Sequence, residues 1–230
     1  AEWVRGLALG LKPFADKPVG RIAIIAETIQ DLREVMVDGV SGLLAIHPNA
    51  ERPSWNVSRR RLEWPNGAVA HGFSAEDPES LRGPQFEAAW CDELAKWQYA
   101  DAAFDMLQFG LRLGDNPRQV ITTTPRPTKL IKRLVADPKT AMSHAPTRAN
   151  AFNLAPNFLQ QIVGRYAGTR LGRQELDGAI IDDNPDALLL ILQGMVAVFE
   201  TVGKLAAALE QIVFGILAAA AAAGLVTAVV

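Results

Sequence analysis

Two adjacent carboxylates follow an apolar run in the first half of the chain. Residues 86–93 read Phe-Glu-Ala-Ala-Trp-Cys-Asp-Glu, so a mostly apolar strand is predicted to end in Asp92 and Glu93. This is the Walker B arrangement of enzymes that hydrolyse nucleotides. In it, Asp92 would hold hydrated magnesium, and Glu93 would orient and deprotonate the attacking water. A second interpretation stays open, because two acids at the start of a helix are also stabilised by the helix dipole.

A second predicted strand, over residues 119–123, ends in hydroxyl groups. Thr122, Thr123 and Thr124 precede Pro125, which stops the strand. Threonines at such a position suit a sensor of the γ-phosphate, although they are also ordinary strand and turn residues. In sheets built from alternating strands and helices, ligands bind beyond the carboxyl ends of the strands. We therefore expect both motifs to face one site.

The elements that position these motifs alternate along the chain. An apolar, β-branched run at 21–26 predicts a buried strand, Thr28 is expected to cap the next helix, and Asn66-Gly67 predicts a hairpin. The remaining strands are predicted over 86–91, 119–123 and around 141–144, and the helices over 2–11, 28–37, 101–113, 128–135, 156–166 and 170–176. This order favours an α/β fold with a mostly parallel sheet covered on both faces.

Composition narrows the classes of function. With 23 basic and 25 acidic residues the net charge is −2, so contact with nucleic acid must come from a local patch. The candidate, called the basic patch below, consists of Arg126, Lys129, Lys132 and Arg133, the last three close together on one predicted helix. The single cysteine excludes an internal disulfide and a thiolate zinc cluster, which favours a reducing compartment.

The end of the chain has a different character. Residues 188–230 contain only three charged side chains, which predicts an apolar, helical tail attached to a domain of residues 1–187. Residues 211–230 carry no charge and have about the length that spans a bilayer core. Their weak hydrophobicity and the lack of basic flanks equally favour packing against protein. Membrane contact and packing on protein both stay open.

The motifs resemble the large subunit of the terminases that package DNA in tailed bacteriophages and gene transfer agents. The similarity covers residues 1–186 and is carried by Ser-Ala-Glu-Asp-Pro-Glu-Ser-Leu-Arg-Gly at 74–83, the acidic pair with residues 94–97, Thr-Thr-Thr-Pro-Arg-Pro at 122–127 and Tyr-Ala-Gly-Thr-Arg at 166–170. It implies a P-loop ATPase sheet of the ASCE type that uses Mg²⁺ and ATP. The implied activity drives double-stranded DNA into a procapsid in the host cytoplasm. The implied partners are the portal, the small terminase subunit and further copies in a ring.

The resemblance also assigns roles to single residues. It makes Asp92 the magnesium ligand, acting through water, and Glu93 the catalytic glutamate. Thr122 to Thr124 match the motif that couples hydrolysis to movement. Arg82 matches an arginine that neighbouring subunits present to the phosphates.

Two parts of the family pattern are missing from the sequence. The phosphate-binding string G-x-x-x-x-G-K-[ST] occurs nowhere, although residues 2–11 look like the helix that such a loop would precede. The strand leading into that loop and the acidic cluster of the family's nuclease domain are also missing. We therefore expect a domain truncated at its N-terminus, with poor nucleotide binding and no nuclease activity.

Three classes of function fit these observations. The first is a terminase ATPase fragment that is inactive alone. The second is a module that binds DNA or the portal without chemistry. The third is a membrane-associated or self-associating protein whose behaviour is set by residues 188–230.

Overall fold

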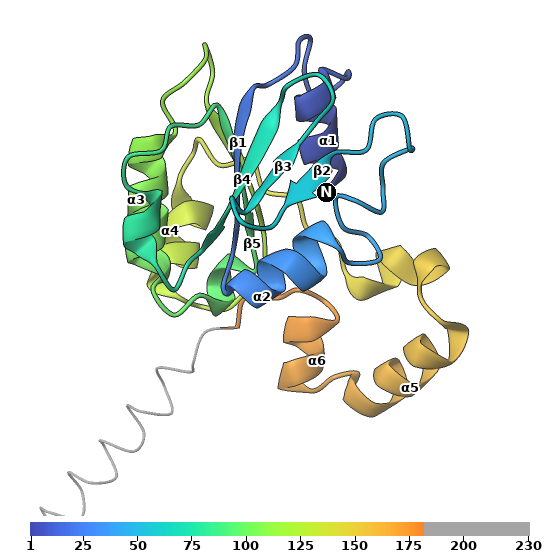
Figure 1. Ribbon diagram of the computed structural model, residues 1–230. Helices are drawn as coiled ribbons and strands as arrows, with labels where there is room; N and C mark the ends of the chain where they lie inside the picture. Colours follow the sequence, from blue (N-terminus) through green and yellow to red (C-terminus); the bar gives the residue numbers. More distant parts are fainter. Residues whose placement is uncertain (182–230) are drawn as a thin grey trace, which may run out of the picture. The chain divides into compact units, whose positions relative to one another are not determined.

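The computed structural model describes residues 1–181, and its central element is a six-stranded sheet (Figure 1). The strand order is β2 (Ser54–Asn56), β3 (Arg61–Glu63), β4 (Val69–Ser74), β1 (Arg21–Ala26), β5 (Ala88–Asp92) and β6 (Arg118–Thr122). Strands β4, β1, β5 and β6 are parallel, whereas β2 and β3 add an antiparallel edge. The predicted α/β class with a mostly parallel sheet is confirmed.

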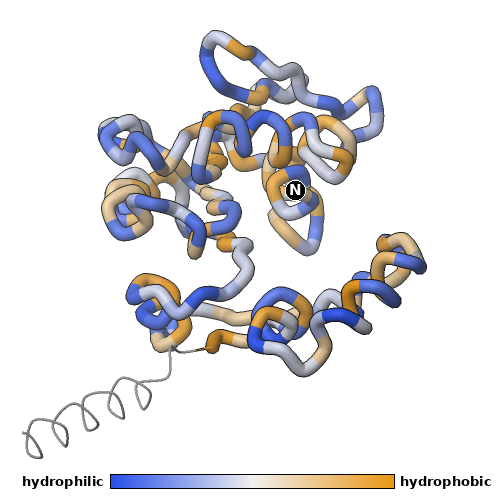
Figure 2. The backbone as a smooth tube through the Cα atoms, turned by 90° about the horizontal axis from the view of Figure 1, so that it is seen from below, coloured by the Kyte–Doolittle hydropathy of each residue, from blue (hydrophilic) through white to orange (hydrophobic). Residues whose placement is uncertain are grey.

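Helices cover both faces of this sheet. The helices are α1 (Glu2–Leu9), α2 (Ile29–Asp31), the π-helix η1 (Leu32–Val37), η2 (Pro78–Leu81), η3 (Leu94–Lys96), α3 (Ala100–Gly110), α4 (Lys129–Ala136), η4 (Thr147–Asn153), α5 (Pro156–Tyr166) and α6 (Arg170–Glu175). Helices α1 and α2 with η1 lie on one face, and α3 and α4 lie on the other (Figure 1). Along the helices, polar and apolar residues alternate, as elements that bury one face require (Figure 2).

Strand β1 divides its side chains between two cores. Ile22 and Ile24 pack in the cluster that contains Leu7 of α1, and Ile25 packs in the cluster that contains Leu107 of α3. Each such side chain contributes roughly 1.5–3 kcal/mol when fully buried. A strand buried on both faces must lie inside the sheet, and β5 is one of its two neighbours. The end of β5 is therefore held by both cores.

The local signals in the sequence are borne out at two turns. The hairpin between β3 and β4 turns at Gly67, whose φ is 88°. There the Asn66 side chain accepts a hydrogen bond from the Ala68 N–H at 3.0 Å. The Thr28 hydroxyl accepts from the Asp31 N–H at 2.9 Å, which is the predicted helix cap.

Two parts of the predicted fold differ from the structure. The strand predicted around 141–144 is wrong, because these residues are irregular and pair with no other strand of the described sheet. They lie between Pro138 and Pro146, and the Met142 side chain is 68% exposed, so no buried face holds them extended. Strand β2 was not expected, because its three residues are too few to show the alternation of polar and apolar side chains that predicts a strand.

The predictions for the tail, including its start at residue 188 and the membrane contact of 211–230, lie outside the described residues. Within residues 1–181, no helix has the length and apolar character needed to cross a bilayer.

Candidate functional site

The acidic turn, residues 92–96, begins where β5 leaves the core. The strand is buried up to Cys91, and Asp92 is its first partly exposed residue. Glu93 adopts φ 52° and ψ 43°, the left-handed backbone conformation that residues other than glycine rarely take. This residue ends the strand abruptly and starts η3. Two successive carboxylates therefore stand at the carboxyl end of a central strand.

The threonine segment, Thr122 to Thr124, is hydrogen-bonded to the acidic turn at three points. Thr122 pairs with Asp92 in the sheet register, and its hydroxyl donates to Asp92 Oδ1 at 2.6 Å. The Thr123 hydroxyl accepts from the Ala95 N–H at 3.0 Å. The Thr124 N–H donates to Glu93 Oε2 at 3.2 Å. The two motifs singled out in the sequence thus meet at one place.

Two tryptophans that the sequence reasoning missed hold this arrangement. Trp90 Nε1 donates to the Thr122 hydroxyl at 2.8 Å, and Trp97 Nε1 donates to the Asp92 carbonyl oxygen at 2.9 Å. An indole N–H is only a donor, so the Thr122 oxygen accepts from Trp90 and its own proton is left for Asp92. Trp90 therefore sets the direction of the hydrogen bond to the carboxylate.

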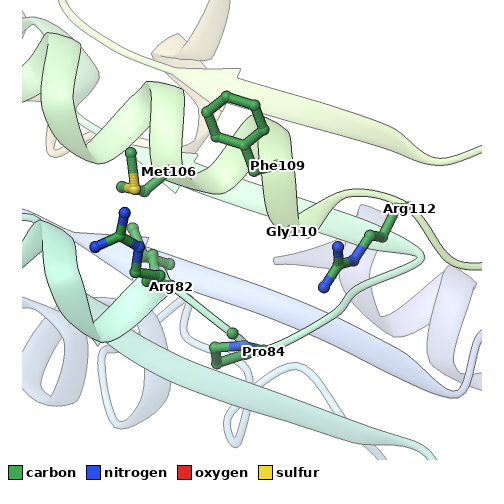
Figure 3. A pocket seen from close by; sticks show the side chains of 8 residues that line it. Arg82, Pro84, Met106, Phe109, Gly110 and Arg112 are labelled. Carbon is green, nitrogen blue, oxygen red and sulfur yellow. The ribbon is translucent and has the colours of Figure 1, made fainter.

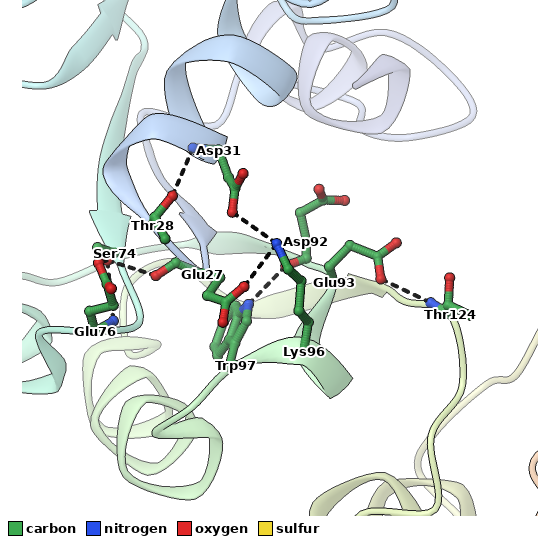
Figure 4. A network of polar contacts seen from close by, with 10 residues as sticks. All are labelled: Glu27, Thr28, Asp31, Ser74, Glu76, Asp92, Glu93, Lys96, Trp97 and Thr124. Atoms are coloured by element: carbon green, nitrogen blue, oxygen red, sulfur yellow. Dashed lines mark hydrogen bonds and ion pairs between the residues drawn. The ribbon is translucent and has the colours of Figure 1, made fainter.

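A lysine ties the acidic turn to the neighbouring strand. The Lys96 ammonium group lies between Glu27 Oε2 at 2.9 Å and Asp31 Oδ2 at 3.2 Å (Figure 4). These hydrogen bonds, with Glu27 first, raise the pKa of Lys96 above its ordinary value. The Ser74 hydroxyl, at the end of strand β4, donates to the Glu27 carbonyl oxygen at 2.7 Å, which connects β4 to the same network. Polar contacts therefore link the ends of all four parallel strands.

The start of α1 borders the same strand ends. The Asp92 carboxylate is among the groups close enough to act electrostatically on residue 1, just before α1.

The donor set at this site suits one kind of metal. Within residues 1–181, no group of three or more His, Cys, Asp or Glu side chains is placed to hold an ion. Asp92 keeps Oδ2 free of any described hydrogen bond, while Oδ1 accepts from Thr122. Mg²⁺ takes one or two carboxylates and completes its shell with water and substrate phosphates, whereas structural Zn²⁺ and Ca²⁺ sites need several protein ligands. The residues present fit magnesium held with a nucleotide.

Arg82 lies at the other end of β5. It follows η2 on a loop, its side chain is 72% exposed, and it pairs with Glu79 at 3.0 Å. The chain must still run along the strand to reach Asp92, which is about 20 Å for six extended residues. The structure therefore does not bring Arg82 to the carboxylates of its own chain.

The basic patch is only partly available to a ligand. Arg133 lies 3.5 Å from Asp105 and 3.7 Å from Asp101, both on α3. Sequence reasoning treated α4 by itself and missed the acids of the helix beside it. Arg126 and Lys129 are exposed, and so is Lys132, which also has a polar partner.

Comparison with known proteins identifies the family. A family model described as the terminase large subunit, T4-like virus type, N-terminal, matches residues 1–190. The chain belongs to this family. Terminase large subunits carry the ATPase domain that serves DNA packaging in bacteriophages. No curated protein sequence matches the chain.

Solved terminase structures are similar to this chain at low sequence identity, and those with a TM-score above 0.5 share its fold. The large terminase of a thermophilic bacteriophage has a TM-score of 0.59 at 13% identity, over 70% of this chain and 41% of that one. The same protein in complex with ADP gives a TM-score of 0.56 at 12% identity over the same shares. The large terminase ATPase domain of Thermus phage P74-26 gives 0.48 at 18% identity, over 70% of this chain and 77% of that one. The chain thus spans less than half of the length of the thermophilic bacteriophage terminase.

Proposed function

We propose that this terminase domain forms the hydrolytic half of an ATP site at the carboxyl ends of β5 and β6. In the complete motor, of a tailed bacteriophage or a gene transfer agent, that site would drive double-stranded DNA into a procapsid. The observation that carries the proposal is the contact of Thr122 with Asp92 at 2.6 Å, because it joins the sensor strand to the metal-binding carboxylate. A solvated helix start would give no reason for a second strand to contact both acids.

The side chains divide the chemistry between them. Asp92, held by Thr122 and Trp97, would bind Mg²⁺ through water, and the ion would supply charge stabilisation for the phosphoryl group. Glu93 accepts from the Thr124 N–H through Oε2, which leaves Oε1 to orient a water and take its proton. A shift of the Glu93 carboxylate would pull on Thr124, and so on the loop that leads into α4. This connection is a physical route from hydrolysis to movement.

Nucleotide binding is the weak part of the site. The large terminase of the thermophilic bacteriophage, which shares this fold, is in complex with ADP in one of its structures, and this supports a nucleotide site here. The residues of this chain place a metal ion and a water, but the sequence has no loop whose N–H groups and lysine would hold the β- and γ-phosphates. We therefore expect the chain to be inactive alone.

The remaining residues would act on other molecules. Because Arg82 is exposed and remote from its own Asp92, it would reach the phosphates bound to a neighbouring copy. Arg126, Lys129 and Lys132 would contact DNA or the portal, whether or not the chain hydrolyses ATP. The small terminase subunit is a further expected partner.

Measurement of ATP turnover tests this proposal. The chain of 230 residues should show no Mg²⁺-dependent turnover above that of its Glu93→Gln variant, even with DNA. The chain extended by the family's upstream strand and phosphate loop should hydrolyse ATP and lose this activity with Glu93→Gln. Glu34→Gln, an exposed carboxylate on η1, is the matched control and should leave turnover unchanged.

Two results would contradict the proposal. Turnover by the chain as given that depends on Glu93 would show that another phosphate-binding element exists. An extended chain that binds ATP without hydrolysing it would show that the acidic turn does not do this chemistry.

A further inference from the structure

A histidine is buried in the core on the α1 face of the sheet. His47 is 3% exposed and belongs to the η1–β2 loop, residues 38–53. In the same loop, Leu43 packs in the core cluster that contains Leu7 of α1 and Trp64, which follows β3. Buried polar groups need hydrogen-bond partners, so the contacts of this imidazole decide which form of the ring the core accepts.

Both ring nitrogens of His47 have partners, and these partners fix the tautomer. Nδ1 lies 2.5 Å from the Leu43 carbonyl oxygen, and Nε2 lies 3.0 Å from Trp64 Nε1. A carbonyl oxygen only accepts, so Nδ1 must carry a proton. An indole N–H only donates, so Nε2 must be the acceptor. The ring is therefore neutral, and no other protonation state satisfies both partners.

A further proton on His47 would turn this contact into a repulsive one. Protonated Nε2 would direct its N–H at the indole N–H of Trp64, so two donors would face each other with no acceptor between them. Trp64 is 3% exposed, so neither donor reaches water while the core stays closed. A buried donor without an acceptor costs free energy. The charged ring is therefore favoured only where the loop has moved away and solvent can reach it.

The charged groups near the ring join α1 to the η1–β2 loop. Among residues 1–181, those that act on His47 are Arg5 and Glu2 of α1 and Glu51 of the loop. Burial is the main cause that lowers the pKa of His47, and Arg5 adds to it, whereas the Leu43 hydrogen bond and the two carboxylates oppose it. Arg5 pairs with Glu51 at 2.6 Å and with Glu2 at 2.8 Å. A cationic ring would repel Arg5 and compete for Glu51, which weakens the ion pair between helix and loop.

We propose that His47 is a proton-controlled latch, which holds the η1–β2 loop against Trp64 and α1 while it is neutral and releases the loop when it is protonated. Release would loosen α1 as well, because the Arg5–Glu51 pair joins this helix to the loop. The effect would reach the acidic turn, since Asp92 acts on residue 1, just before α1. The latch does not depend on whether Glu93 catalyses hydrolysis.

The pH dependence of release has a definite sign. Because the pKa of His47 in the closed state is below its ordinary value of about 6.5, the released loop binds a proton more readily than the closed one. Release therefore takes up one proton. Its equilibrium constant should rise by up to about tenfold for each pH unit below about 6.5, until the ring is protonated in place. At higher pH the constant should not depend on pH.

Hydrogen exchange of the 230-residue chain, corrected for the intrinsic effect of pH on exchange, tests the latch by mass spectrometry. From about pH 7.5 to about pH 5, the opening constants of residues 38–53 and 2–9 should rise as stated. His47→Gln should remove the rise, because its amide oxygen can accept from Trp64 but takes up no proton. His71→Gln changes a half-buried histidine whose ring has no hydrogen bond within residues 1–181, and this matched control should keep the rise. The same rise in His47→Gln, or no rise in the original chain, would overturn the proposal.

A second variant keeps the test decisive if His47→Gln does not fold. Trp64→Phe retains an aromatic ring at this position but lacks the N–H that faces Nε2 of His47. Protonation then no longer sets two donors against each other, so the rise should be smaller than in the original chain. An unchanged rise would exclude the opposed donors as the cause of release and would overturn the proposal.

Helix α3 supplies the internal reference, because it packs in the other core cluster. Its end is joined to the loop before β5 by the Phe86 N–H, which donates to the Gly110 carbonyl at 2.8 Å. A separate cavity of about 350 Å³, lined by Arg82 and Arg112 among others, lies at this junction (Figure 3). The opening constants of α3 should not follow those of the loop. An equal rise in α3 would mean that acid unfolds the whole domain, which would overturn the latch.

Discussion

The two ends of β5 are built in different ways. At the carboxyl end, Asp92 and Glu93 accept hydrogen bonds from Thr122 and Thr124, and indole groups fix the atoms around them. At the amino end, Arg82 makes one exposed ion pair and otherwise faces an open pocket. Groups that act within their own chain are held in place before the ligand arrives. The exposure of Arg82 fits its proposed role on another molecule, which would supply its remaining contacts.

The largest effect is expected from Gly6→Ala, which tests whether the packing of α1 supports the carboxyl end. A Cβ on Gly6 would lie 2.2 Å from Phe14 Cδ2 and 2.9 Å from Phe14 Cβ, so the helix or the ring must move. Overpacking of this kind costs about 1–3 kcal/mol of unfolding free energy. Urea denaturation measures it.

Gly164→Ala is the matched control for this change, because a Cβ there meets nothing within 4 Å. This variant should keep or slightly raise the unfolding free energy, since alanine favours a helix over glycine by about 1 kcal/mol. Equal stability of the two variants would show that α1 is not held by close packing.

Thr122→Val tests the side-chain hydrogen bonds at the carboxyl end of β5. The change removes the donor to Asp92 and the acceptor of Trp90, and it should lower the unfolding free energy by about 1 kcal/mol. Thr124→Val is the control, because Thr124 meets Glu93 through its backbone N–H, which valine retains. If both variants lost the same stability in urea, the side-chain hydroxyl of Thr122 would have no special role.

Lys96→Met tests the link between the acidic turn and β1, and its effect depends on pH. Because the pKa of Lys96 is raised in the folded chain, its ion pairs contribute fully below the ordinary lysine pKa of about 10.4. The contribution is lost as the pH rises through the folded pKa above that value. The side chain is 48% exposed, so at pH 8 we expect a loss of about 0.5 kcal/mol.

The difference between the original chain and Lys96→Met should shrink when the thermal midpoints are compared above pH 11 instead of at pH 8. A difference that stays constant across this range would mean that packing of the lysine stem, and not its charge, supports the acidic turn.

The smallest effect is expected at the amino end of β5. Both side chains of the Arg82–Glu79 pair are about 70% exposed, so Glu79→Gln should change the unfolding free energy by less than about 0.5 kcal/mol. Its control is Arg82→Gln, which should be equally neutral in urea. A large loss in either variant would mean that Arg82 is fixed within its own chain and is not available to another.

The sequence predicted those parts of the molecule whose signals are local. The β-branched run at β1, the Asn66-Gly67 turn and the acidic pair after an apolar strand each lie within a few residues. The expected meeting of Thr122 with Asp92 followed from the rule that ligands lie at strand ends, which needs only the strand order. The false strand at 141–144 had the right composition but no partner.

The rest of the site depends on residues far apart in the chain. Lys96 meets Asp31 across a separation of 65 positions, and Trp90 looked like an ordinary core residue until its indole N–H was seen against Thr122. Arg133 looked available for DNA because no local sequence pattern shows that Asp101 and Asp105 of α3 lie beside it. Such contacts are set by how helices pack on the sheet, which the pattern of a single helix does not encode.

Strand β6 has a practical consequence for anyone who handles the protein. It is the last strand of the described sheet, so the outer row of its amide and carbonyl groups is paired with no strand among residues 1–181. Residues 119–124 are uncharged and free of proline, and Val120 and Ile121 are only half-buried. Such an edge accepts further strands. We therefore expect precipitation to be governed by concentration and to begin at this edge.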